Sequence, residues 1–381
     1  MIQPEEFISA AKKSGIDFIT GVPDSLLKDL CACITDSYPV HQHIIASNEG
    51  SAIALGMGHF LATNRLPLIY MQNSGLGNIV NPLTSLADPE VYSIPMLLMI
   101  GWRGEILDDG TQIHDEPQHV KQGRITLKQL DILEIPYHIL DNNTQNISNI
   151  IQVMTGKATE RSGPVALVAR KGTFSEFRLD LPDQDLELPT REEAIRTILD
   201  NLPGNIPIVS TTGMASREVF EIRKQTCMSH EQDFLTVGGM GHASQIAAGI
   251  ALARPGSRVV CIDGDGAVLM HTGALAINAD CHNLIHIVIN NEAHDSVGGQ
   301  PTKGSVLNFA EIARNFGYQT SYRVNSIIDL QQRLHESIHG HGSIMIEIKC
   351  RCGSQEDLGR PDRTPVENKI EFMQNMETSH E

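Results

Sequence analysis

The stretch Val259-Val260-Cys261-Ile262-Asp263-Gly264-Asp265-Gly266, followed by Asn290-Asn291, decides the fold of this chain. An apolar strand ends in a carboxylate between two glycines, and a second apolar strand, residues 284–289, leads into two amides. Residues 267–283 read as a turn and one amphipathic helix. Parallel strands end together at the carboxyl edge of a sheet, where ligands bind. The pattern therefore predicts an α/β sheet whose edge carries one ligand site.

The chemistry of these side chains favours a metal bound together with a phosphate. Mg²⁺ prefers a few protein oxygens plus those of a bound phosphate, and Asp265 and an asparagine amide can supply the former. Gly264 and Gly266 would let the backbone approach the phosphate closely. The alternative is that both motifs are ordinary turns at strand ends.

Composition excludes several classes of function. The chain has 381 residues and a formal net charge of −17, which disfavours nucleic acid and anionic membranes as partners. It shows no secretory signal and no apolar run long enough for a membrane span. Seven cysteines without a C-x-x-C pair favour buried, reduced thiols over zinc or disulfides. We expect a cytoplasmic protein.

Strands and helices alternate throughout, which predicts two α/β domains with mainly parallel sheets. The expected boundaries are residues 1–173 for the first domain, 174–190 for an acidic, proline-flanked linker, 191–352 for the second domain and 353–381 for a polar tail. The expected strands are residues 17–20, 43–46, 66–71, 95–100 and 165–169, then 206–210, 234–237, 259–262, 284–289, 320–324 and 344–348.

The Gly-Asp-Gly…Asn-Asn spacing resembles the motif of thiamine diphosphate (ThDP) enzymes. The resemblance implies that Asp265, the side chain of Asn291 and the carbonyl of Ala293 bind Mg²⁺. It also places residues 264–267, namely Gly264, Asp265, Gly266 and Ala267, at the diphosphate. In this family one domain binds the aminopyrimidine and the other the diphosphate, with two subunits meeting at one cofactor. A homo-oligomer is therefore implied.

A carboxylate is expected at the other end of such a cofactor, because its pyrimidine must exchange a proton during activation. Glu49, in the Asn48-Glu49-Gly50 turn between a strand and a helix, matches the family's glutamate segment. A carboxyl group in a dry pocket tends to have a raised pKa and can shuttle that proton. The alternative is that Glu49 only complements a helix N-terminus.

Two further segments match cofactor contacts of the family. Met240 fits the bulky residue that bends the cofactor, and the carbonyl of Gly238 fits the acceptor for its amino group. Thr212 and Gly213, at another strand end, are expected beside the pyrimidine or diphosphate. Residues 239–244 also imitate a dinucleotide fingerprint, but they lack its third glycine and the downstream acidic residue.

The whole chain resembles the compact phosphonopyruvate and sulfopyruvate decarboxylases, which lack the middle domain of larger relatives. The resemblance is carried by residues 21–25, 72–78, 101–104, 115–119, 291–302 and 357–361. It implies conversion of 3-phosphonopyruvate to phosphonoacetaldehyde and CO₂, within biosynthesis of a phosphonate such as 2-aminoethylphosphonate.

Residues that handle the substrate are less well defined by the sequence. Asp24, His119 and His294 are candidate proton donors after CO₂ has left, although a lone histidine is more often a structural hydrogen-bonding residue. The candidate cations for an anionic substrate group are Arg103, Lys121, Arg124 and Lys303. Two alternatives to the phosphonopyruvate activity remain: a sulfopyruvate decarboxylase, and a non-catalytic ThDP-fold subunit with a binding or regulatory role.

Overall fold

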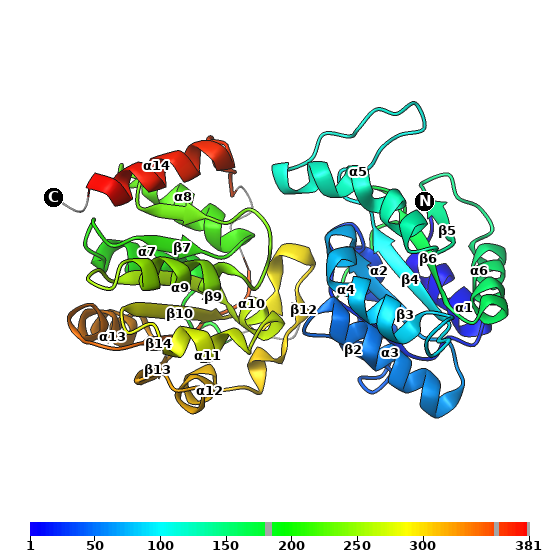
Figure 1. Ribbon diagram of the computed structural model, residues 1–381, viewed down its shortest axis with the longest axis horizontal. Helices are drawn as coiled ribbons and strands as arrows, with labels where there is room; N and C mark the ends of the chain where they lie inside the picture. The colour runs from blue at the N-terminus through cyan, green and yellow to red at the C-terminus, as the bar shows by residue number, and fades with distance from the viewer. Residues whose placement is uncertain (180–184, 354–357, 379–381) are drawn as a thin grey trace. The chain divides into compact units, whose positions relative to one another are not determined.

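The computed structural model describes residues 1–179, 185–353 and 358–378. The chain divides into two units, Met1–Leu181 and Pro182–Glu381 (Figure 1). Each unit contains one six-stranded sheet in which every strand pairs parallel to its neighbours. None of the described helices is both long enough and apolar enough to cross a membrane.

The first unit has the strand order β2-β1-β3-β4-β6-β5. Its strands are β1 (Ile19–Gly21), β2 (His43–Ile45), β3 (Leu68–Gln72), β4 (Met96–Gly101), β5 (Tyr137–Leu140) and β6 (Pro164–Ala169). Its helices are α1 (Pro4–Lys13), α2 (Lys28–Ser37), α3 (Glu49–Thr63), α4 (Leu76–Pro82), α5 (Pro117–Ile132) and α6 (Ile147–Arg161). A 3₁₀ turn, η1 (Asn73–Gly75), precedes α4, and a π turn, η2 (Leu83–Ala87), follows it.

Helices cover both faces of this sheet, as its fully apolar central strands require. Side chains of α1, α2 and α6 pack on one face, and those of α3, α4 and α5 pack on the other. All six residues of β4 are buried. Phe174, at the start of the expected linker, is buried in the core of this unit.

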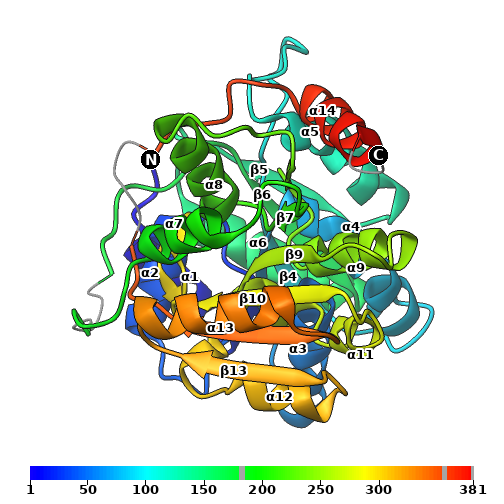
Figure 2. The same ribbon diagram turned by 90° about the vertical axis from the view of Figure 1, so that its left-hand side faces the viewer.

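The second unit has the strand order β13-β14-β10-β9-β7-β8. Figure 2 labels β13, β10, β9 and β7 of this sheet. Its strands are β7 (Ile208–Ser210), β8 (Asp233–Leu235), β9 (Val259–Gly264), β10 (Leu284–Asn290), β13 (Thr320–Val324) and β14 (Ile344–Lys349). A short antiparallel hairpin joins β11 (Ala293–His294) to β12 (Gln300–Pro301). Its helices are α7 (Arg191–Asn201), α8 (Met214–Gln225), α9 (Ala243–Ala253), α10 (Asp265–Met270), α11 (Ala274–Ala279), α12 (Phe309–Asn315), α13 (Ile327–His339) and α14 (Pro365–Thr378).

The two sheets share one topology. Counted in chain order within each unit, both read 2-1-3-4-6-5 from one edge to the other. In the second unit α7, α8 and α13 cover one face, while α9, α11 and α12 cover the opposite face. Asp24 and Glu49 follow the first two strands of their unit, whereas Asp265 and Asn291 follow the third and fourth strands of theirs.

Two expectations from the sequence are wrong. Residues 267–283 do not form one helix, because α10 ends at Met270 and α11 begins at Ala274. The cysteines are all free, as expected, but Cys227 is exposed and Cys352 is half-buried.

The expected linker and tail include residues 180–184, 354–357 and 379–381, which lie outside the described residues. The boundaries expected for the domains stay predictions. In the tail, α14 packs along the edge strand β8: the Asn368 amide donates to the Asp233 carbonyl at 2.7 Å and accepts from the Leu235 N–H at 3.1 Å. These bonds use backbone groups that an uncovered edge strand would leave unpaired.

Candidate active site

Asp265 and Asn291 follow neighbouring strands of the second sheet. Strands β9 and β10 pair in parallel, with Gly264 opposite Ile289. Asp265 and Asn291 therefore lie at the same carboxyl edge of the sheet. Asp265 begins α10 and is buried, and this burial raises the pKa of Asp265 to about 6. A cation beside the carboxylate would oppose that shift, because an opposite charge favours the ionised form.

The orientation of Asn291 is fixed by a chain of buried charges. Its amide nitrogen donates to the Asp295 carboxylate at 2.6 Å, and that carboxylate accepts from Arg191 at 2.7 Å. Arg191 also makes a two-pronged ion pair with Glu218, at 2.7 and 3.0 Å. The amide oxygen accepts a long hydrogen bond from the Ala293 N–H at 3.4 Å, and its second lone pair is left for a cation. No orienting role for Asp295, Arg191 or Glu218 was evident from the sequence, and only Asp295 lies near the motif in sequence.

The segment after Asn291 folds back over Asp265. The Thr302 hydroxyl donates to the Asp265 carboxylate, and the Gly304 carbonyl accepts from the Asn290 amide at 2.9 Å. A Cβ atom on Gly304 would collide with both Asp265 and Asn290. Asn290 also donates to the buried Glu347 carboxylate at 2.8 Å, which holds the strand end in place. Thr302 belongs to the stretch of sequence that carries the resemblance, but the sequence assigned no role to it or to Gly304.

These residues fit a magnesium ion and a diphosphate. Asp265 and Asn291 offer hard oxygen donors, which Mg²⁺ prefers. Gly264 has no atom within 4 Å of the position of a Cβ, so its backbone leaves room for a bulky anion. Asp265, Gly266 and Ala267 form the buried first turn of α10 behind it.

Met240 and His294 meet at Gly266. A Cβ on Gly266 would lie 3.0 Å from the His294 ring and 3.2 Å from the Met240 methyl carbon. Burial lowers the pKa of His294 to about 4, so its imidazole is neutral at pH 7. Gly238 and Met240 belong to the loop between β8 and α9.

Thr212 and Gly213 lie in the turn between β7 and α8, at the same edge. Gly213 has a φ of 92°, and a Cβ there would lie 3.6 Å from Ser296, in the segment that covers Asp265. The neighbouring Thr211 hydroxyl is buried and has no hydrogen-bond partner among the described residues. The structure thus brings Asp265, Asn291, Ala293, His294, Met240 and Gly213 together in the second unit.

Glu49 is the first residue of α3 in the first unit, capped by the Asn48 side chain, which accepts from the Ser51 N–H at 2.9 Å. The Glu49 carboxylate is buried and accepts from the Asn78 amide at 2.7 Å. A Cβ on Gly75 would lie 2.7 Å from one oxygen of that carboxylate. The segment from Gly75 to Asn78 therefore shapes the surroundings of Glu49.

Asp24 lies at the end of β1 in the same unit and is fully buried. This burial raises the pKa of Asp24 to about 6, although the charge of Arg103 acts in the opposite direction. One oxygen accepts from the Leu26 N–H at 3.1 Å, and the other has no hydrogen-bond partner among the described residues. A carboxyl group with this pKa can hold a proton near neutral pH.

His119 lies in the first turn of α5, and burial lowers the pKa of its imidazole. Its Nδ1 atom has no hydrogen-bond partner in the part of the chain that is described. Arg103, whose charge acts on both Asp24 and His119, is held by Asp115 through two hydrogen bonds. The other candidate cations, Lys121, Arg124 and Lys303, are exposed.

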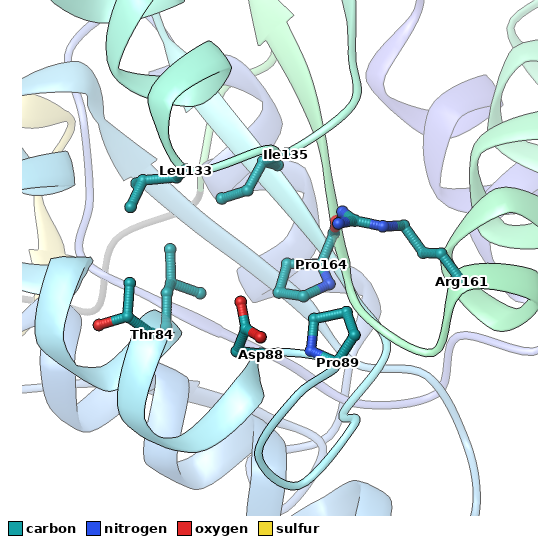
Figure 3. Close-up of a pocket in the computed structure, with 8 residues that line it drawn as sticks. Thr84, Asp88, Pro89, Leu133, Ile135, Arg161 and Pro164 are labelled. Atoms are coloured by element: carbon teal, nitrogen blue, oxygen red, sulfur yellow. The ribbon is translucent and has the colours of Figure 1, made fainter.

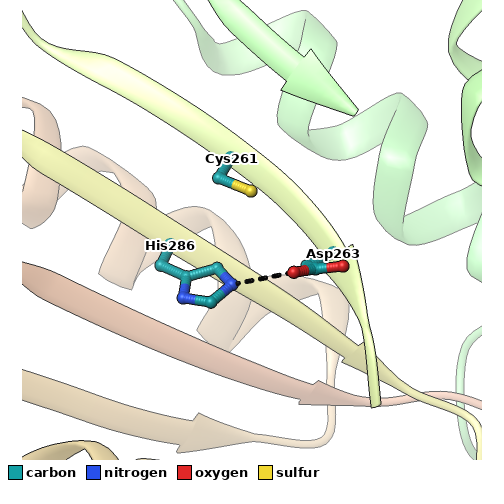
Figure 4. A group of neighbouring side chains, drawn as sticks. All are labelled: Cys261, Asp263 and His286. Carbon is teal, nitrogen blue, oxygen red and sulfur yellow. Dashed lines mark hydrogen bonds and ion pairs between the residues drawn. The ribbon is translucent and has the colours of Figure 1, made fainter. Parts of the chain in front are cut away.

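A buried polar cluster lies on β9 and β10, before the turns that carry Asp265 and Asn291. Cys261, Asp263 and His286 offer ligand-type atoms within 4.8 Å of one another, and all three side chains are buried (Figure 4). His286 lies 3.4 Å from Asp263 through Nε2 and 3.1 Å from the Tyr318 hydroxyl through Nδ1. Asp263 accepts from the Gly264 N–H at 3.0 Å. The cluster therefore links the sheet interior to the turn that presents Asp265.

Figure 3 shows a small hollow in the first unit. It is lined by Leu83, Thr84, Asp88, Pro89, Leu133, Ile135, Arg161 and Pro164. Pro164 is the first residue of β6, and Ile135 precedes β5. The hollow is thus at the amino ends of these strands, and Asp24 and Glu49 lie at the opposite edge.

Comparisons with known proteins identify relatives of both units. Residues 5–130 match the N-terminal TPP binding domain of thiamine pyrophosphate enzymes, and residues 211–348 match their C-terminal TPP binding domain. A phosphonopyruvate decarboxylase from Streptomyces viridochromogenes is 33% identical over 96% of this chain and 93% of its own length. Another from Streptomyces hygroscopicus is 31% identical over 96% of this chain and 92% of its own. A sulfopyruvate decarboxylase from Methanosarcina acetivorans is 28% identical over 86% of each chain.

Proposed function

The chain belongs to the thiamine pyrophosphate enzymes and is a ThDP-dependent decarboxylase of a pyruvate analogue, and from that premise we propose that its substrate is 3-phosphonopyruvate. The products are phosphonoacetaldehyde and CO₂, and the enzyme serves phosphonate biosynthesis in the cytoplasm. The observation that carries the proposal is the match to phosphonopyruvate decarboxylase along 96% of the chain. The sulfopyruvate relative also contains both units in one chain, so fusion of the units does not decide the substrate.

In this proposal the second unit holds Mg²⁺ and the diphosphate. Asp265, the amide oxygen of Asn291 and the carbonyl of Ala293 are the metal ligands. Support comes from the hard oxygen donors at one sheet edge and from the buried chain that orients Asn291. When bound, ThDP supplies an electron sink for the electrons released as CO₂ leaves.

Glu49 is the proton-transfer residue at the pyrimidine of the cofactor. Its buried carboxylate is held by the Asn78 amide at 2.7 Å, so its orientation is set before a cofactor arrives. A positioned general acid–base group typically contributes roughly 10²- to 10⁴-fold to a rate. Glu49→Gln keeps the size of the side chain but removes the transferable proton.

Asp24 is the proposed donor of the proton that replaces CO₂ on the substrate carbon. Its pKa of about 6 leaves part of the population protonated near neutral pH, and one of its oxygens has no partner among the described residues. His119 and His294 are neutral at pH 7 because burial lowers the pKa of both, so each would act as a neutral hydrogen-bond donor or acceptor.

The enzyme is proposed to be a homo-oligomer with each cofactor bound between subunits. Helices α3 and α9 hold equivalent places in the two units, and both are apolar on more than one side. Leu61 on α3 is 65% exposed and Leu252 on α9 is 61% exposed. Exposed leucines on apolar helices are typical of protein interfaces. Light scattering tests this part, and a monomer at working concentrations would refute it.

The substrate is tested by assaying phosphonopyruvate and sulfopyruvate in parallel with ThDP and Mg²⁺ present. We expect a higher kcat/KM for phosphonopyruvate, measured from CO₂ and aldehyde release. Equal or faster turnover of sulfopyruvate would overturn the substrate assignment. Turnover of neither acid would favour a non-catalytic subunit.

A further inference from the structure

Arg103 is a half-buried cation at the carboxyl edge of the first sheet, just after β4 ends at Gly101. Its backbone N–H donates to the Asn73 amide oxygen at 3.2 Å, and its carbonyl accepts from the Asn73 amide nitrogen at 2.9 Å. Asn73 begins η1, whose last residue, Gly75, lies against the Glu49 carboxylate. Arg103 is therefore tied to the turn that shapes the surroundings of Glu49.

The side chain of Arg103 lies beside the proposed proton donor. Its Nη1 atom donates to the Ser25 hydroxyl at 2.8 Å, and Ser25 follows Asp24 directly in the chain. Asp24 lies against the end of β4, since a Cβ on Gly101 would collide with its carboxylate. The charge of Arg103 also opposes the burial that raises the pKa of Asp24. The guanidinium and the Asp24 carboxyl group are therefore neighbours at this edge.

Asp115 holds the Arg103 guanidinium in one orientation and leaves part of it for a ligand. The Nε and Nη2 atoms donate to the two carboxylate oxygens of Asp115, and Nη1 donates to Ser25. These bonds use three of the five N–H groups of a guanidinium. The remaining N–H groups have no partner among the described residues. The side chain is 19% exposed, so a solute has access to it.

Other cations of this unit are less suited to hold an anion. Arg170, which follows β6, is paired with two carboxylates that together exceed its own charge. Lys121 and Arg124 are exposed on α5, where water and salt weaken their attraction for an anion. Arg103 has one carboxylate partner, a partly buried position and N–H groups to spare. It is therefore the best placed of these four residues.

We propose that Arg103 binds the phosphonate group of the substrate and thereby selects 2-oxo acids that carry an anionic group on C3. The inference rests on the proposed function and names the residue that recognises the substrate. A guanidinium can bind a phosphonate through two parallel N–H···O bonds, which the opposite charges strengthen. The phosphonate is attached to the carbon next to the one that receives the proton. A cation beside Asp24 therefore holds the reacting carbon near its proposed proton donor.

The test is the steady-state kinetics of Arg103→Lys with ThDP and Mg²⁺ present. Lysine keeps a positive charge opposite Asp115, so the fold should be retained, but it cannot make the two-pronged contact. KM for phosphonopyruvate should rise roughly tenfold, while ThDP affinity measured by calorimetry stays unchanged. A purely structural role would lower kcat or ThDP affinity and leave KM unchanged. A KM within about twofold of the wild-type value would refute the inference.

A double variant, Arg103→Met with Asp115→Asn, removes both charges and leaves no buried charge unpaired. KM for phosphonopyruvate should rise roughly a hundredfold, because the whole cationic contact is lost. Pyruvate has no anionic group on C3, so kcat/KM for pyruvate should fall by a smaller factor than kcat/KM for phosphonopyruvate. Equal falls for the two acids would show general damage to the site and would contradict the inference.

Arg170→Lys is the matched control, because Arg170 is also a partly buried, paired arginine and follows the strand next to β4. Its guanidinium donates to Glu105 at 3.1 Å and to Asp108 at 2.9 Å. This variant should keep KM for phosphonopyruvate within about twofold of the wild type. A rise equal to that in Arg103→Lys would refute a specific role for Arg103. Failure of the wild-type protein to decarboxylate phosphonopyruvate would instead refute the proposed function.

Discussion

At the scale of single residues, the Asp24 carboxyl group is completely buried, and this burial makes the stability of the folded protein depend on pH. Its folded-state pKa is raised from 3.8 to about 6, so the unfolded chain releases this proton more readily than the folded one. The free energy of unfolding therefore falls as pH rises from about 4 to about 6 and stays lower above that range. The full decrease due to Asp24 is on the order of 3 kcal/mol.

Asp24→Asn should remove this decrease while preserving the size of the side chain. We expect the cofactor-free variant to be more stable than the wild type, and its advantage should grow by about 1 kcal/mol between about pH 5 and about pH 7.5. Urea unfolding at both pH values measures this difference. Asp36→Asn, at an exposed aspartate, is the control and should not change the profile. An advantage that shrinks with rising pH would contradict the assignment.

Single site residues can be predicted from the sequence when they belong to a motif with a recognisable spacing. Asp265 and Asn291 were both found at strand ends, and the structure carries them at one edge because β9 and β10 are neighbours. Arg191 was not found, because its partners Glu218 and Asp295 lie 27 and 104 residues away in sequence. No spacing rule connects such residues before the fold is known. The roles assigned to the site residues stay predictions.

At the scale of elements, the turn from β3 into α4 is built around Glu49. Gly75 ends the 3₁₀ turn η1 and Gly77 is the second residue of α4, and their surroundings differ. A Cβ on Gly75 would lie 2.6 Å from the Glu49 side chain, whereas a Cβ on Gly77 would have no atom within 4 Å. Replacing each glycine by alanine therefore distinguishes an effect of displacing Glu49 from a general effect of losing a glycine.

Gly75→Ala should displace the Glu49 carboxylate and lower kcat by roughly 100-fold, because small misplacements of a catalytic group are costly. Gly77→Ala should retain kcat within about twofold, since nothing is displaced. Steady-state assays and melting temperatures of both variants measure these effects. Equal losses of kcat in the two variants would contradict the role given to this turn.

Element prediction was accurate for buried strands and poorer at irregular segments. The expected strand at 320–324 coincides with β13, and those at 259–262 and 284–289 match β9 and β10 apart from their last residues. The edge strand β5 was not expected, because its four residues are only partly buried and show no long apolar run. The β11–β12 hairpin was missed because a pair of two-residue strands leaves no periodic signal.

At the scale of the whole molecule, the two units repeat one sheet order. Glu49 follows the second strand of its unit, and the Gly238–Met240 loop follows the second strand of the other. A cofactor that needs Glu49 at one end and Asp265 at the other requires both units. The proposed homo-oligomer supplies them from different copies.

Mixing two inactive variants tests this assembly. Glu49→Gln damages only the first unit, and Asp265→Ala damages only the second. In a dimer with shared sites, each mixed dimer has one site with both units intact, so refolding an equal mixture should restore about a quarter of wild-type activity. Each variant refolded alone is the control. No recovery in the mixture would show that one chain supplies both ends of its own site.

The most direct test of ThDP-dependent decarboxylation is CO₂ release from phosphonopyruvate by enzyme stripped of cofactor and metal. The stripped protein should be inactive, and adding ThDP and Mg²⁺ together should restore turnover, while either alone should not. Glu49→Gln should remain inactive under the same conditions. CO₂ release that persists without ThDP, or wild-type turnover by Glu49→Gln, would contradict the account.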